Sequence, residues 1–549
     1  MIFRLSTRVT LLFLSIALAV LSGCGSGGGG SSSTSASPPP PAPTSTVTAD
    51  VVVYAATPSG IAAAIESAHL GKQVVLLEPG QHVGGMTSSG LGVTDVYTQS
   101  ALGGLVKTFF STVASLYGPA NTDNQNGTRY EPHIAEQAFN QMLGQQKNLQ
   151  VVFNATLSSI TMNGTTITSL HASNGTAYDA KEFIDASYEG DLMAAAKVSY
   201  TVGRESTAQY NESIAGVWIP SPLGGFTIDP YVTPGNPSSG LLQHIESITF
   251  GAPGSADTSV MAYNYRLCVS TDPGNQIPFS APANYDPMEF EVLGRYAQAL
   301  TASGKSTGLG NFLLAESLPN GKLDVNNSGG FSTDDVAANT AYPDGSAATR
   351  QQIIADHRHY VQGLLYFLAT DPRIPQPVQT TIKSWGLCKD EFTDNGGWPR
   401  QLYVREARRM IGAYVMTQQD VQNKTPIADP IGLGGYPFDN HLQHRVVVSG
   451  NTEDEAGRGT NRGSAPYPIP YRALTPQPTQ ATDLLVTVDV SASHVAYESL
   501  RVEPTYMIMG QAAGAAASLA VDENATVQNV SYPALANQLT ADGQVLTAP

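Results

Sequence analysis

The stretch from residue 50 to residue 92 constrains the fold of this chain more than any other part of the sequence. It begins with the apolar, β-branched run Val51–Tyr54, which predicts a buried parallel strand. A tight turn over residues 55–60, a helix of small residues from Ile61 to about Leu70 and a second apolar strand over residues 74–77 follow. Because an acidic residue comes directly after the second strand, this order predicts a dinucleotide-binding βαβ unit.

Two features of this unit would contact a nucleotide. The first turn of a helix presents free N–H groups and the positive end of the helix dipole to a pyrophosphate. The acid after the second strand, Glu78, can accept hydrogen bonds from a ribose diol. The candidate cofactor-binding residues in this unit are Ala55, Ala56, Thr57, Pro58, Ser59, Gly60 and Glu78.

The glycine fingerprint of the unit is incomplete. The pattern G-x-G-x-x-G would place glycine at positions 55, 57 and 60, but the chain has Ala55, Thr57 and Gly60. Gly60 keeps the close contact between helix and strand, whereas Thr57 must direct its side chain away from the phosphates. On this unit alone, an ordinary βαβ crossover without a nucleotide remains an alternative.

A second glycine segment, residues 82–92, favours the nucleotide. A glycine pair just after the ribose acid lets the backbone approach a long cofactor a second time. The candidate cofactor-binding residues of this segment are Gly84, Gly85, Met86, Thr87 and Gly90.

Two later segments complete the predicted site. An apolar strand ends in Asp185, Ala186 and Ser187, where small residues allow close approach to a cofactor at the carboxyl end of a strand. Near the C-terminus, an apolar strand at residues 484–488 precedes a long helix with a Gly/Ala face. Its candidate cofactor-binding residues are Gly510, Gln511 and Ala512, and the two distant halves indicate one interwoven nucleotide domain.

These motifs resemble those of an FAD-dependent oxidoreductase family within the glutathione-reductase-like flavoprotein superfamily. Thr57 and Pro58 fit its first turn, Gly-Gly-Thr-Pro-Ala-Gly, whereas Ala55 and Ala56 depart from it. The runs that resemble its "(F/Y)EPHVAE", "DATYEGDL" and "YVREARR" motifs lie at residues 130–136, 185–192 and 403–409.

The resemblance implies FAD as the cofactor and a three-layer α/β Rossmann domain with an inserted α+β substrate domain. It also implies that the N-terminus of the last long helix points at the flavin pyrimidine ring, where its dipole favours the negative charge of reduced flavin. We expect the FAD-binding domain at residues 49–210 and 480–549, and the substrate domain at residues 211–479. Within the latter, the "YVREARR" run is expected to be helical.

The N-terminus has the pattern of an export signal. Two arginines precede the apolar run Val9–Leu21, which is too short to span a bilayer well. Residues 21–24 resemble the lipobox of bacterial lipoproteins, so we expect a signal peptide at residues 1–23 and lipidation of Cys24. Residues 24–48 would be a disordered Gly/Ser/Pro tether. A plain secretory signal is the alternative.

Charge and cysteine content narrow the partners. The net charge of −17 argues against nucleic acid and against docking on anionic lipid, which leaves the lipid anchor as the expected membrane contact. Cys268 and Cys388 either pair or remain two buried thiols, and without a Cys-x-x-Cys motif no flavin–disulfide relay is indicated. His441 and His444 are expected on opposite faces of a strand, so no metal is predicted.

The chain is therefore predicted to be an exported FAD-dependent oxidoreductase that transfers a hydride between flavin and a small organic or sugar-like substrate. The candidate catalytic residues are His494 as a base, Arg501 as the holder of an anionic substrate group or of the charge on reduced flavin, and Glu503 beside them. A capping role for His494 and an ion pair for Arg501 are the structural alternatives. The competing function is a non-redox surface protein, glycan-binding or of polysaccharide-lyase type, on a flavoprotein fold. The second glycine segment disfavours an NAD-only dehydrogenase.

Overall fold

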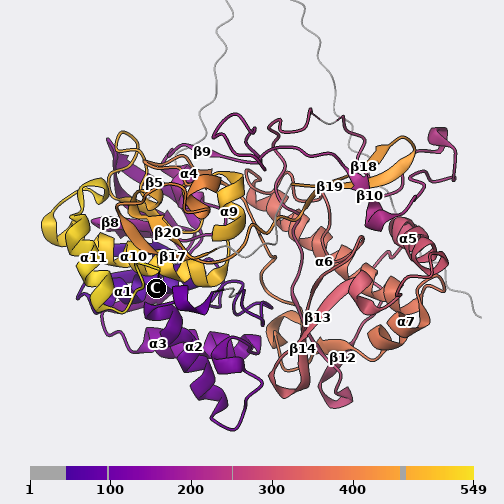
Figure 1. The fold of residues 1–549 in the computed structure, drawn as a ribbon. Coiled ribbons are helices and arrows are strands. Elements are labelled where there is room, and N and C mark those ends of the chain that lie inside the picture. Colours follow the sequence, from indigo (N-terminus) through magenta and orange to yellow (C-terminus); the bar gives the residue numbers. More distant parts are fainter. Residues whose placement is uncertain (1–44, 96–97, 250, 458–464, 549) are drawn as a thin grey trace, which may run out of the picture. The chain divides into compact units, whose positions relative to one another are not determined.

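A five-stranded parallel sheet joins the beginning and the end of the chain (Figure 1). The computed structural model describes residues 45–548 except 96–97, 250 and 458–464, so the predicted signal and Cys24 lie outside the described residues. The strand order is β21-β8-β2-β3-β4. The strands are β2 (Val51–Tyr54), β3 (Val74–Leu77), β4 (Leu149–Val152), β8 (Glu182–Asp185) and β21 (Leu484–Val486).

Side chains alternate between the two faces of this sheet. Val51 and Val53 of β2 belong to the core shared with helices, whereas Val52 and Tyr54 belong to the core shared with a second sheet. The second sheet has the order β1-β7-β6-β5, and β1 pairs with β7 in parallel while the other pairs are antiparallel. Its strands are β1 (Ser45–Thr48), β5 (Leu157–Asn163), β6 (Thr166–Ala172) and β7 (Thr176–Asp179).

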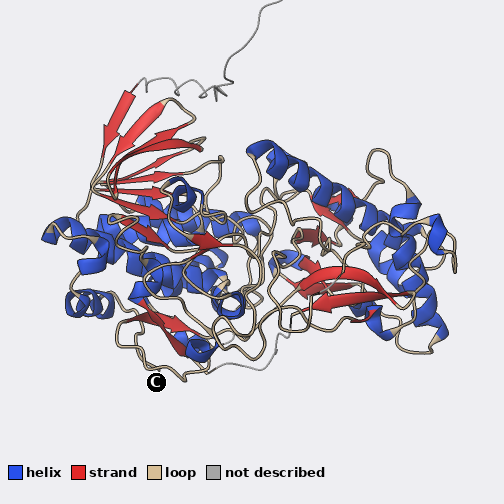
Figure 2. Ribbon diagram, turned by 90° about the horizontal axis from the view of Figure 1, so that it is seen from above, coloured by secondary structure: helices blue, strands red, loops and turns tan. Residues whose placement is uncertain are grey.

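Helices cover the other face of the parallel sheet (Figure 2). Helix α1 begins where Thr57 caps the N–H of Gly60 and Pro58 occupies the first turn, and it ends before Gly71, whose φ of +82° suits glycine. The helices on this side are α1 (Pro58–His69), α2 (Gly104–Tyr117), α3 (Pro132–Gly144), α10 (Glu503–Glu523) and α11 (Tyr532–Ala541). The predicted α/β class with a parallel sheet is confirmed.

The strand before the second sheet belongs to the first sheet. β4 pairs with β3 in parallel and forms the edge of the first sheet. The chain from α3 returns directly to this edge and then enters the second sheet at β5.

In residues 211–479, three helices of eight or more residues accompany a second five-stranded sheet of order β12-β15-β11-β14-β13, whose pairs are antiparallel. Its strands are β11 (Leu267–Ser270), β12 (Gln276–Pro278), β13 (Leu313–Ser317), β14 (Lys322–Asn327) and β15 (Gly386–Cys388). The helices are α5 (Glu291–Ala302), α6 (Ala347–Thr370) and α7 (Gln376–Lys383). The domain boundaries stay a prediction.

The remaining α-helices and strands are short. They are α4 (Asp191–Ala195), α8 (Gln418–Val421), α9 (His494–Leu500), β9 (Tyr200–Thr201), β10 (Ser221–Pro222), β16 (Arg409–Met410), β17 (Pro430–Gly434), β18 (Leu442–Val448), β19 (Asn451–Ala456) and β20 (Tyr467–Pro470). These strands form three small sheets of order β10-β19-β18, β16-β9 and β17-β20. Within the described part of the chain, no helix is both long and apolar enough to cross a membrane.

The expectation of a helix at the "YVREARR" run is wrong. Residues 403–408 are extended or irregular, and the run ends in the short strand β16. Its three arginines are buried, and their ion pairs reach carboxylates in separate segments: Arg405 with Asp334, Arg408 with Asp191 and Arg409 with Glu205. Tertiary pairing of buried charges therefore overrides helical periodicity here.

Candidate cofactor and active site

The turn between β2 and α1 has the geometry of a nucleotide-binding turn although its glycines are incomplete. Ala55 adopts φ +74°, a left-handed conformation that normally favours glycine. A Cβ atom at Gly60 would lie 2.0 Å from the carbonyl oxygen of Ala55, so position 60 requires glycine. The hydroxyl of Thr57 donates to the carbonyl of Ala186 at 2.8 Å, which ties the turn to the end of β8.

A cavity of about 610 Å³ opens beside this turn. Its size lies within the usual range for small-molecule and cofactor sites, about 300–1,000 Å³. Predicted cofactor residues from three separate segments line it: Ala55, Thr57, Glu78, Gly85 and Ser187. Residues at the start of the second sheet, Thr156 and Leu157, form another part of its wall.

Glu78 closes the turn from the end of β3. One carboxylate oxygen accepts from the N–H of Ala56 at 2.9 Å, and the other accepts from the N–H of Gly80 at 2.6 Å. Burial raises the pKa of Glu78, although these N–H groups favour its charged form. Each carboxylate oxygen has a second lone pair, so Glu78 can still accept a ribose hydroxyl from the cavity that it lines.

The second glycine segment packs tightly behind the cavity. The N–H of Gly84 donates to the carbonyl of Ala56 at 2.7 Å, and both Gly84 and Gly85 have positive φ. Added Cβ atoms would meet the ring of Phe139 at 2.7 Å and the hydroxyl of Tyr188 at 2.5 Å. Packing within the protein therefore already requires this glycine pair, apart from any cofactor.

The remaining candidates of this segment are buried. The N–H of Met86 donates to the hydroxyl of Tyr188 at 3.0 Å. The hydroxyl of Thr87 has no hydrogen-bond partner among the described residues. A Cβ atom at Gly90 would lie 2.0 Å from the carbonyl oxygen of Arg266, so this position also needs glycine.

Asp185 shapes the joint after β8. Its carboxylate accepts from the N–H and hydroxyl of Ser187, at 3.0 and 2.7 Å, and from the N–H of Met193 at 2.8 Å. Burial raises its pKa to about 6. Asp185 therefore holds the backbone of the joint in place, and Ser187 is the member of this group that reaches the cavity.

Helix α10 packs directly on α1. A Cβ atom at Gly510 would lie 2.1 Å from the carbonyl oxygen of Ser59, so α10 contacts the first turn of α1. Gln511 points elsewhere: its amide accepts from the N–H of Leu105 and donates to Glu66, both at 2.9 Å. Ala512 is fully buried.

The first turn of α10 carries Glu503, which bonds to the wall of the cavity. The hydroxyl of Tyr188, a lining residue, donates to Glu503 Oε1 at 2.7 Å. The other carboxylate oxygen, Oε2, has no partner among the described residues. Burial raises the pKa of Glu503 to about 8.

Arg501 is buried and already paired. Its Nη2 lies 2.9 Å from Asp439 Oδ2, and its Nη1 donates to the hydroxyl of Tyr403 at 3.3 Å. Asp439 lies in the segment before β18. Arg501 therefore forms an ion pair with a distant part of the chain and not with Glu503. An anionic substrate group would have to compete with Asp439 for this guanidinium.

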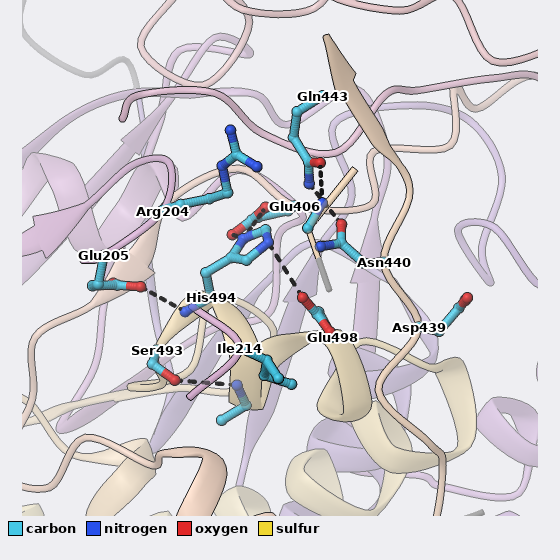
Figure 3. A network of polar contacts seen from close by, with 12 residues as sticks. Arg204, Glu205, Ile214, Glu406, Asp439, Asn440, Gln443, Ser493, His494 and Glu498 are labelled. Carbon is cyan, nitrogen blue, oxygen red and sulfur yellow. Dashed lines mark hydrogen bonds and ion pairs between the residues drawn. The ribbon is translucent and has the colours of Figure 1, made fainter. Parts of the chain in front are cut away.

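His494 is the first residue of α9 and is only 2% exposed. Figure 3 shows its ring between two acids: Nδ1 lies 2.9 Å from Glu406, and Nε2 lies 3.5 Å from Glu498. Burial disfavours the charged ring, but Glu406 outweighs it and raises the pKa of His494. Its backbone N–H donates to Glu205 at 2.8 Å, and His494 does not line the cavity. Its role as a base stays a prediction.

Asp489 is a further candidate that sequence reasoning missed. It lies three residues after β21, is fully buried, and neither carboxylate oxygen has a partner among the described residues. It borders the joint after β8, because a Cβ atom at Gly190 would lie 2.5 Å from Asp489 Oδ2. An unpaired buried carboxyl is costly, so a hydroxyl-bearing ligand at this point would relieve it. An acid just beyond the carboxyl end of a strand was the available signal.

One group of the described residues has its ligand atoms close enough for a metal, namely Glu131, His133 and Glu391. The ammonium of Lys322 already lies 2.7 Å from Glu131 and 2.8 Å from Glu391. Lys322 therefore already provides the positive charge beside Glu131 and Glu391.

This arrangement defines an α/β protein with a dinucleotide-type cavity at the carboxyl ends of its parallel strands. A model of the FAD dependent oxidoreductase family matches residues 50–539, and the chain belongs to this family. It is an FAD-dependent oxidoreductase, and its cofactor is FAD.

Other comparisons add no closer relative. A search of curated proteins found no match. Among solved structures, OxyS anhydrotetracycline hydroxylase from Streptomyces rimosus is 11% identical with a TM-score of 0.23, over 32% of this chain and 40% of that one. Thioredoxin reductase from T. acidophilum is 16% identical with a TM-score of 0.17, over 25% and 34%. The chain thus spans less than half the length of either structure.

Proposed function

We propose that this oxidoreductase transfers a hydride between FAD and a small, uncharged, hydroxyl-bearing substrate of sugar-like type, on a glutathione-reductase-like Rossmann fold. The observation that carries the proposal is the contact between Tyr188, which lines the cavity, and Glu503, which begins α10. This contact connects the cofactor cavity to the buried carboxylate of Glu503.

The described residues fit FAD. The first turn of α1 would face the pyrophosphate, and Glu78, which lines the cavity, would face the adenosine ribose. Asp489 does not line the cavity, but its unpaired carboxyl beside Gly190 would bind a hydroxyl of the cofactor. The bound flavin would supply the acceptor or donor of the hydride. The side chains of the protein would carry out the other steps of the reaction.

Glu503 is the best placed group to hold a proton. Its Oε2 has no partner among the described residues, while Oε1 is fixed by Tyr188. A pKa raised to about 8 lies near the working range of a general acid or base at neutral pH. Oxidation of an alcohol carbon releases a hydroxyl proton, and Glu503 Oε2 is where the chain would accept it.

Three buried arginines favour an uncharged substrate because each already pairs with a carboxylate. Arg501, Arg405 and Arg266 are bound by Asp439, Asp334 and Asp324, respectively. No guanidinium of this trio is left without a carboxylate, so an anionic substrate would have to break a buried ion pair. A neutral polyol needs only hydrogen bonds.

The test is flavin reduction in a single turnover, with neutral sugars and polyols as substrates. Glu503→Gln keeps the acceptor for Tyr188 but cannot take a proton, so we expect reduction to slow about 10²- to 10⁴-fold. Glu182→Gln, a buried acid at the start of β8 that does not line the cavity, is the matched control. If His494→Ala slows reduction while Glu503→Gln does not, the base is His494. If substrates with a carboxylate reduce the flavin best and Arg501→Met abolishes this, the uncharged substrate class is wrong.

Export and lipid anchoring are part of the proposal. The apolar run and the Leu-Ser-Gly-Cys sequence before position 25 support them. Because Arg4 and Arg8 are not adjacent, the chain would cross unfolded and capture FAD outside the cytoplasm. Acyl labelling of wild type and of Cys24→Ser tests the anchor, and an acylated, membrane-bound Cys24→Ser protein would contradict it.

A further inference from the structure

Two buried cysteines face each other in the sheet of residues 211–479. Cys268 lies in β11 and Cys388 in β15. The register pairs Val269 with Leu387 and Ser270 with Gly386, so the next position along the antiparallel pair places Cys268 opposite Cys388. Directly opposed residues point to the same face of a sheet.

The geometry of such a pair suits a covalent bond. Opposed residues in antiparallel strands have Cα atoms about 4.5–5.5 Å apart, and disulfides span Cα separations of about 4.4–6.8 Å. The two sulfur atoms lie 2.7 Å apart, and both residues are fully buried. The register and the short distance between the sulfur atoms therefore both favour a disulfide.

We infer that Cys268 and Cys388 form a disulfide in the mature protein. The inference rests on the proposed export, because disulfides persist in oxidising compartments. Two S–H bonds break and one Sγ–Sγ bond forms. Two electrons pass to a disulfide-bearing thiol oxidant of that compartment, which is reduced to a dithiol with the two protons.

The bond would form during folding. Burial raises the pKa of the Cys268 thiol well above its ordinary value, so the folded protein offers little thiolate for exchange. The sulfur atoms also lie against Leu318 and Phe392, away from solvent.

The bond would brace the segment that follows the glycine pair of the cofactor site. In the same sheet, Cys268 is paired with Asp324 of β14. The Asp324 carboxylate accepts from the N–H groups of Gly92 and Val93, at 3.1 and 3.0 Å, and binds Arg266. A covalent link between β11 and β15 therefore stiffens the support of residues 92–93.

Peptide mapping of the full-length protein, isolated from membranes and alkylated without reductant, tests the inference. We expect one cross-linked pair of peptides that contains Cys268 and Cys388. Recovery of both peptides as separate alkylated species from an extracytoplasmic fraction would overturn it.

A second measurement does not depend on export. The unfolded, reduced chain is refolded in glutathione buffers of increasing oxidised fraction, and the same peptides are mapped. If the chain is found only in the cytoplasm, a bond formed in vitro supports the pair while the export proposal fails. If the bond does not form even under fully oxidising refolding, the proposed disulfide between Cys268 and Cys388 is wrong.

Stability gives the third readout. For a link between residues 120 apart, loop-closure entropy predicts that reduction lowers Tm by about 5 °C. In the Cys268→Ala/Cys388→Ala variant, reductant should leave Tm unchanged. An equal response of both proteins to reductant would contradict the disulfide.

Discussion

Ala55 is held in a conformation that costs energy, and replacing it isolates that cost. Its φ of +74° places the Cβ atom against the following carbonyl, which costs about 1–2 kcal/mol for an L-residue. Ala55→Gly removes this strain. The change also makes the unfolded chain more flexible, at about 0.4–1 kcal/mol, and removes a buried methyl group, at about 0.8 kcal/mol.

The neighbouring Ala56 provides the matched control. It is also buried in the same turn, 0% exposed against 6% for Ala55, but its φ is not positive. Ala56→Gly also makes the unfolded chain more flexible and removes a buried methyl group, but it relieves no strain. It should therefore destabilise the protein by about 1–2 kcal/mol. Ala55→Gly should be nearly neutral, so the two variants should differ by about 1–2 kcal/mol.

Urea unfolding of the apoprotein, followed by fluorescence and by circular dichroism, measures the difference. The slopes with denaturant should match among the three proteins, so that the midpoints report stability. Equal midpoints for the two variants, or a lower midpoint for Ala55→Gly, would show that the left-handed alanine is not strained.

Two other substitutions test the site and its surroundings. Gly60→Val should abolish FAD binding, because even a Cβ atom would lie 2.0 Å from the carbonyl oxygen of Ala55. Gly144→Val is the control, since a Cβ atom there meets nothing within 4 Å. Normal FAD content in Gly60→Val would contradict the described geometry of the turn. Burial raises the pKa of Glu66 from 4.5 to about 9, so the folded protein holds the Glu66 proton more tightly than the unfolded chain. The resulting stabilisation is complete below the pKa of the unfolded state and is lost as the pH rises through the pKa of the folded state. The free energy of unfolding of Glu66→Gln, relative to wild type, should therefore rise by at least about 1 kcal/mol between about pH 5 and pH 8. Unfolding curves of both proteins measure this difference, and the exposed Glu523→Gln is the control. A difference that did not change with pH would refute the prediction.

Local patterns predicted the nucleotide unit because the information lies within a few residues. The apolar run before Ala55, the small residues after Gly60 and the acid at Glu78 determine β2, α1 and the closing of the turn. The start of α3 at Pro132 carries the same kind of local signal, since proline is favoured at the first turn of a helix.

Long-range pairing was not predictable from the same patterns. Arg501 belongs with Asp439, and His494 with Glu406, across 62 and 88 residues, respectively. A buried charge selects its partner by the fold, and one sequence does not reveal that choice. The unpaired carboxyl of Asp489 became visible only once its surroundings were known.

The order of strands in the parallel sheet has a consequence for synthesis on the ribosome. β21 pairs with β8, and α10 covers α1, so β8 at residues 182–185 and α1 at residues 58–69 gain these partners only after the chain from residue 484 onward has been made. A nascent chain that lacks these residues has an unpaired edge at β8 and an uncovered α1, and non-local contacts of this kind form slowly. We therefore expect the protein to bind FAD only after the whole chain has been synthesised.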